Sequence, residues 1–123
     1  MIEIIPSPDH VAAIRMRGTI GAEQFDAAIS EIEGKLSGRE EIGVVVDLGG
    51  FEGITSEALG RDLKYAFDKM GELHRFKRVA YITDKDWIEA AATVSDSVLP
   101  QIELRVFDTQ EADEAMAWAS KLE

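Results

Sequence analysis

The sequence has no cysteine and only three prolines among its 123 residues. The absence of thiols excludes disulfide bonds, thiolate metal sites and a cysteine nucleophile, and it is consistent with a reducing compartment. Apolar runs are only a few residues long, as at Val11 to Ile14, so none approaches the roughly 20 residues that a membrane-spanning helix needs. The start, Met1-Ile2-Glu3, has no basic residue and no long apolar stretch after it. We therefore expect a cytoplasmic protein without a secretory leader.

Positive charge is also scarce, because 13 Lys and Arg face 24 Asp and Glu, which gives a net charge of -11. A chain this acidic repels phosphate backbones and anionic lipid, so we expect no nucleic-acid partner and no membrane insertion. The composition is otherwise that of an ordinary globular protein, with 46% hydrophobic and 30% charged residues. The length predicts a single domain over residues 1–123.

Strands and helices alternate along the chain. Two short apolar segments at the N-terminus are separated by a turn that contains Pro6 and Pro8, which predicts an antiparallel pair of strands. The remaining strands are predicted between helices, which favours parallel pairing through right-handed crossovers. The predicted strands are Ile2–Ile5, His10–Met16, Ile42–Leu48, Arg78–Thr83 and Ile102–Phe107.

Four helices are predicted from apolar residues at helical spacing. The first carries the stripe that begins at Phe25, and Gly38 marks its end. The second begins at Ser56 as N-cap, the third runs from Asp84 to Pro100, and Asp108 or Thr109 caps the last. The predicted fold is α/β, with a mostly parallel sheet of four or five strands and an antiparallel N-terminal pair.

The segment from Asp47 to Ser56 is the most informative part of the sequence. It follows the predicted central strand and leads into a helix N-terminus, where open α/β sheets place their binding sites. We expect it to be an exposed loop flanked by Asp47 and Ser56. Its glycines match neither a dinucleotide-binding nor a phosphate-binding motif, so no nucleotide cofactor is predicted.

Ser56 has two interpretations that the sequence leaves open. As an N-cap, its hydroxyl accepts a hydrogen bond from a free backbone N–H and contributes about 1 kcal/mol. As a phosphoacceptor, it would carry nearly two negative charges at a helix N-terminus, which tolerates anions.

Catalytic chemistry has little support in the sequence. His10 and His74 lie far apart, and neither a metal-binding spacing nor a nucleophile motif is present. Asp84 and Asp86 flank a predicted helix start, where capping explains them. We predict no enzyme, no catalytic residue, no metal and no cofactor.

Several short motifs resemble the STAS domains, and in particular their SpoIIAA-like branch, the anti-anti-sigma factor-like proteins. They include Asp47-Leu48 followed by Ile54-Thr55-Ser56-Glu57-Ala58-Leu59, and later Asp86-Trp87, Arg105-Val106-Phe107-Asp108 and Glu114-Ala115-Met116-Ala117-Trp118. The resemblance implies a β-α superhelical fold and a regulatory function. It also implies that the family's phosphorylated serine falls on Ser56. Here Thr55 replaces the usual Asp and Glu57 adds a negative charge, so we expect that Ser56 is not constitutively phosphorylated.

Two functions follow as hypotheses. The first is a non-catalytic module that binds a protein partner through the Asp47–Leu59 segment and the second helix, with Asp47, Gly50, Gly53, Thr55, Ser56 and Glu57 as its candidate residues. The second rests on the architectural similarity of this branch to lipid-binding CRAL-TRIO domains. It is a carrier or sensor of a small apolar ligand held between the second helix, the third helix and the sheet, with Ile54, Leu59, Leu63, Phe67 and Trp87 as cavity candidates.

Two surface features add further expectations. Residues 61–78 hold six basic and three acidic residues, so this segment is either a solvated flank or a docking surface for an acidic partner. Trp118 lies at the border of the last helix's apolar face, where an aromatic side chain covers a sheet edge or meets another chain. A homodimer is therefore a further hypothesis.

Overall fold

Five strands form one mixed sheet in the computed structural model, which describes residues 1–68, 75–83 and 103–121. The strand order follows the sequence, so β3 lies at the centre. β1 is antiparallel to β2 and all other neighbours are parallel, which confirms the predicted sheet. The strands are β1 (Ile2–Ile4), β2 (Val11–Ile20), β3 (Ile42–Ile54), β4 (Phe76–Ile82) and β5 (Glu103–Phe107).

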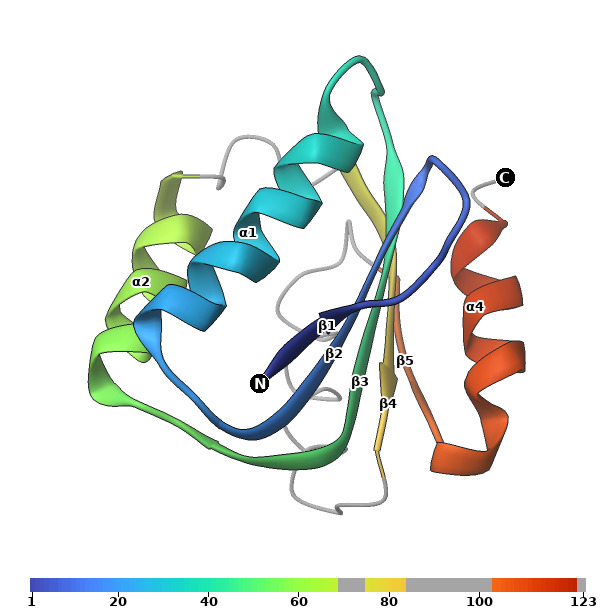
Figure 1. Ribbon diagram of the computed structural model, residues 1–123. Helices are drawn as coiled ribbons and strands as arrows, with labels where there is room; N and C mark the ends of the chain where they lie inside the picture. The colour runs from blue at the N-terminus through green and yellow to red at the C-terminus, as the bar shows by residue number, and fades with distance from the viewer. Residues whose placement is uncertain (69–74, 84–102, 122–123) are drawn as a thin grey trace.

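Three α-helices occur in the described residues, and Figure 1 shows α1 and α2 on one side of the sheet and α4 on the other. They are α1 (Ala22–Leu36), α2 (Ser56–Asp68) and α4 (Ala112–Ser120), and a 3-10 turn at Thr109–Glu111 precedes α4. The third predicted helix, between Asp84 and Pro100, lies outside the described residues together with its Trp87.

Each face of the sheet buries its own core because successive side chains of a strand point to opposite faces. Val11, Ala13 and Val45 pack with α4, whereas Ala12 and Val44 pack with α1. The central strands are therefore covered on both sides, which explains why Val44-Val45-Val46 is apolar without alternation.

β3 continues to Ile54, so the predicted exposed loop between Asp47 and Ser56 is wrong. At each of two register shifts, β3 contains one more residue than the opposite part of β2. These are bulges in β3, and β3 stays paired with β2 beyond both of them. The second shift follows Gly18, whose φ of 68° is a conformation that favours glycine. Bulges of this kind leave no periodic signal in the sequence, and the glycines here resemble those of a loop.

The helix starts follow capping chemistry, with one correction. Thr55, not Ser56, caps α2, because its hydroxyl accepts a hydrogen bond from the Ala58 N–H at 3.1 Å. Since β3 runs up to Ile54, the cap position falls on Thr55 and Ser56 becomes the first helical residue. The Asp108 carboxylate accepts from the Gln110 N–H, as predicted for the start of the last helical segment.

Helix α4 approaches β3 very closely at Gly43. A Cβ atom on Gly43 would lie 2.1 Å from the Ala119 carbonyl oxygen, so only glycine fits there. Nearby, His10 Nε2 lies 2.8 Å from the Ser120 carbonyl oxygen. These two contacts place the end of α4 over the start of β2 and β3.

Candidate functional site

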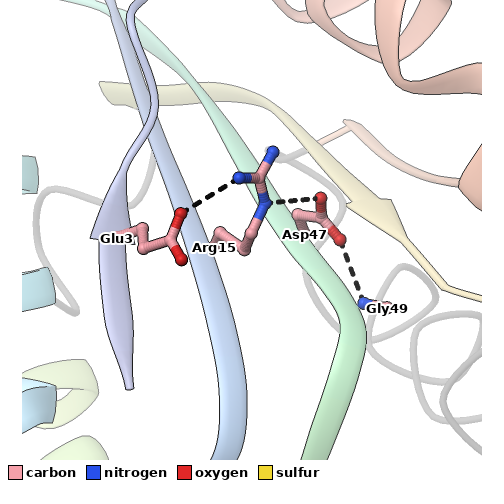
Figure 2. Close-up of polar contacts among 4 residues, drawn as sticks. All are labelled: Glu3, Arg15, Asp47 and Gly49. Carbon is pink, nitrogen blue, oxygen red and sulfur yellow. Dashed lines mark hydrogen bonds and ion pairs between the residues drawn. The ribbon is translucent and has the colours of Figure 1, made fainter.

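An ion-pair network joins β1, β2 and β3 (Figure 2). Arg15 Nε donates to Asp47 Oδ2 at 3.2 Å, and Arg15 Nη1 donates to Glu3 Oε2 at 3.1 Å. The other Asp47 oxygen, Oδ1, accepts from the Gly49 N–H at 3.0 Å. Asp47 therefore satisfies a backbone N–H at the first bulge of β3 and pairs with a charged side chain on the neighbouring strand.

The contacts of the network favour the charged form of Arg15 and hold the Asp47 side chain in place. The pKa of the Arg15 guanidinium is raised, chiefly by its hydrogen bond to Asp47; partial burial opposes this, and the bond to Glu3 adds to it. The Asp47 side chain is only 17% exposed, and both of its oxygens have partners. These contacts assign Asp47 a structural part in shaping β3.

The β3–α2 junction, defined here as residues 52–59, presents apolar and acidic side chains at the surface. Ile54 is 37% exposed and Leu59 is 45% exposed, although both are large hydrophobic residues. Glu52, Glu57 and Ser56 are also exposed, whereas Ala58 is fully buried and anchors the first turn of α2. Ile54 and Leu59 lie five positions apart in the sequence, and exposed apolar surface is typical of binding sites where it is contiguous.

The described basic residues of the 61–78 segment mostly bind to their own fold. Arg61 forms ion pairs with Asp26 of α1 and, at 3.9 Å, with Glu57. Three more lie in β4 or directly before it: Arg75 donates to the Leu36 and Arg39 carbonyls, Lys77 pairs with Glu41, and Arg78 donates to the Trp118 carbonyl. Lys64 is exposed on α2. The contacts favour the interpretation of a flank over that of one basic docking surface.

Trp118 covers the sheet from α4. Its ring packs against Phe107 at a centroid distance of 5.9 Å, and the Arg78 guanidinium lies 4.9 Å from the ring centroid. The side chain therefore has a packing function within one chain. The homodimer stays a prediction.

An apolar cavity of about 430 Å³ lies between the sheet and α1. Strands β2, β3 and β4 line one side, α1 lines the other, and Tyr65 of α2 contributes from the flank. Its lining includes Phe25, Ala28, Ile29, Val46, Ile54 and Tyr81. Pockets for small molecules commonly have this size and this apolar character.

The cavity is partly open to solvent, and its exposed walls are mostly apolar. An apolar occupant would therefore remove apolar surface from water, which is favourable.

The described residues show neither a metal site nor a membrane-spanning helix. No group of three or more His, Asp or Glu side chains in residues 1–68, 75–83 and 103–121 is arranged to hold a metal ion. In the same ranges, no helix has both the length and the apolar character needed to cross a membrane.

Comparison with known proteins gives the family. The SpoIIAA-like family model matches residues 11–120. The chain belongs to the SpoIIAA-like family. A solved structure from Shewanella loihica PV-4, an uncharacterized protein from the DUF3478 family with a SpoIIAA-like fold, is similar, with 27% identity and a TM-score of 0.75. The alignment covers 97% of this chain and 92% of that chain, whereas the comparison with curated proteins found no match.

In this SpoIIAA-like chain the predicted partner-binding residues divide into two groups. Asp47 belongs to the ion-pair network, and Gly50 lies next to the Arg17 side chain within the same strand pair. Gly53, Thr55, Ser56 and Glu57 lie at the β3–α2 junction.

The predicted cavity residues separate as well. Ile54 lines the cavity, whereas Leu59 is exposed and is not among the lining residues. The side chains of Leu63 and Phe67, and all of Trp87, lie outside the described part of the chain. The cavity lies against α1, which was not expected to line it, and α2 contributes Tyr65. The expected contribution of the third helix lies outside the described residues and stays a prediction.

Arg15 and Glu3 of the ion-pair network were not predicted from the sequence. A charged residue that follows the apolar run Val11 to Ile14 is a signal for a paired side chain. The partner could not be identified, because the pairing of Arg15 with Asp47 depends on the strand register.

Proposed function

We propose that this SpoIIAA-like chain is a non-catalytic regulatory module that binds a protein partner through the β3–α2 junction and α2. The observation that supports this most directly is the exposure of Ile54 and Leu59 within one short junction. Neighbouring Glu52 and Glu57 give the surface a negative rim, as in interfaces with an apolar centre and a polar edge. We place its function in the cytoplasm.

The test is affinity capture from a lysate of the source cells with the wild-type chain and two variants. Ile54→Ser with Leu59→Ser should abolish recovery of the partner, because apolar anchors supply much of the binding energy. Ile4→Ser is the matched control, since Ile4 is 49% exposed but lies on β1. Equal recovery by all three proteins would contradict the proposal.

The cavity supports a second candidate function, a carrier or sensor of a small apolar ligand. Its volume of about 430 Å³ and its Phe, Ile, Val and Tyr lining favour an apolar molecule. Native mass spectrometry of the freshly purified chain tests this function. A co-purifying compound of lipid-like mass would support it, and a mass equal to that of the bare chain at all stages of purification would contradict it.

A further inference from the structure

A polar depression lies between α1 and α2, immediately outside the apolar cavity. Its lining residues are Asp26, Ile29, Arg61, Lys64, Tyr65 and Asp68. Ile29 and Tyr65 line the cavity as well, so the cavity and the depression meet at these two side chains. A molecule with an apolar chain in the cavity would reach the charged groups of the depression by extending past Ile29 and Tyr65.

The charges of the depression nearly cancel one another. Arg61 is paired with Asp26, and exposed Lys64 and Asp68 add one charge of each sign. An anionic group would meet Asp68 and a chain of net charge -11, whereas a cationic group would meet Lys64 and Arg61. A polar group without net charge avoids both penalties and still has hydrogen-bond donors and acceptors to contact.

We propose that the cavity binds a single-chain amphiphile with an uncharged polar head, and that the head lies in the depression between α1 and α2. The proposal rests on the second candidate function and adds the chemical class of the ligand. It also gives the ligand an orientation, with the chain against Ala28 and Val46 and the head near Lys64 and Asp68.

The test is methyl NMR of the full chain titrated with decanol, decanoate or decylammonium below their aggregation concentrations. Decanol should shift the Ile29 methyl signals saturably and leave those of Ile82 unchanged, because Ile82 packs in the core on the α4 side. Decanoate and decylammonium should bind at least about tenfold more weakly. Equal or tighter binding of either charged probe would overturn the assignment of an uncharged head.

A pair of α1 variants tests the position of the chain. Ala28→Leu places three additional carbon atoms in the cavity and should weaken decanol binding by about tenfold or more. Ala27→Leu is the matched control, since Ala27 is the exposed neighbour on the same helix, and it should bind as the wild type does. Equal affinities for the two variants would show that decanol binds elsewhere and would contradict the proposal.

The same experiments separate this proposal from the function on which it rests. If decanol leaves Ile29 unshifted while native mass spectrometry finds a co-purified apolar compound of another class, the carrier function stands and the uncharged amphiphile is wrong. If decanol leaves Ile29 unshifted and the chain carries no compound, both are wrong.

Discussion

At the scale of single residues, Gly43 shows how little space separates α4 from β3. Its missing Cβ leaves room for the Ala119 carbonyl, which would otherwise lie 2.1 Å away. Gly43→Ala should therefore push α4 from the sheet and lower the free energy of unfolding by about 3 kcal/mol or more, above the usual range for overpacking because the obstacle is backbone.

Chemical denaturation of Gly43→Ala and Gly53→Ala measures this difference. Gly53 lies in the same strand and has open space where its Cβ would be, so Gly53→Ala should change the free energy of unfolding by less than about 1 kcal/mol. Equal losses for the two variants would mean that α4 does not rest on Gly43.

Thr55 and Ser56 differ by one position and have different functions in α2. Thr55→Ala removes the hydroxyl that accepts from Ala58 N–H and should cost about 1 kcal/mol of stability. Ser56→Ala replaces an exposed helical residue with a better helix former, so it should be neutral within about 0.5 kcal/mol. Urea denaturation of both variants measures this, and a larger loss for Ser56→Ala would restore Ser56 as the cap.

At the scale of elements, the first bulge of β3 depends on the Asp47 carboxylate. Asp47→Ala leaves the Gly49 N–H and a half-buried Arg15 without this partner, so it should cost about 1–3 kcal/mol. Asp47→Asn keeps an acceptor for Gly49 and should cost less. Hydrogen exchange at the Gly49 amide measures the local effect, and equal protection in the wild type and in Asp47→Ala would contradict the assignment.

The pH dependence of the network follows from the raised pKa of Arg15. A group whose pKa is raised by folding stabilises the fold fully at a pH below its pKa in the unfolded state. It loses that effect as the pH rises through its pKa in the folded state. Both pKa values of Arg15 lie in the strongly alkaline range, so Arg15 should contribute no change in the free energy of unfolding between about pH 6 and about pH 9.

Most elements could be predicted from the sequence because burial leaves a periodic pattern. The run Val44-Val45-Val46 predicted a central strand, and Asp108 predicted the start of the last helical segment correctly. The length of β3 could not be predicted, because its bulges are stabilised by pairing with β2 and by the Asp47–Gly49 hydrogen bond.

The candidate site was predicted less completely than the fold. Ile54 was expected in a cavity and lines one, and α1 contributes to that lining beside Tyr65 of α2. The Arg15–Asp47 contact joins residues 32 positions apart in the sequence, and such contacts follow only from the strand register.

At the scale of the whole molecule, the surfaces separate into distinct regions. α4 covers one face of the sheet and packs against it at Gly43 and through Trp118. The opposite face holds the cavity, and the β3–α2 junction lies at its edge through Ile54. The two proposed sites thus share Ile54, whereas Leu59 belongs to the junction and is not among the residues that line the cavity.

The most direct test of the partner-binding function is therefore the affinity of the captured partner for three purified proteins, measured by calorimetry. Leu59→Ser should weaken binding by about tenfold or more, whereas Ile4→Ser should bind within about twofold of the wild type. Unchanged affinity of Leu59→Ser, or an equal loss for Ile4→Ser, would contradict the assignment of the β3–α2 junction as the binding surface.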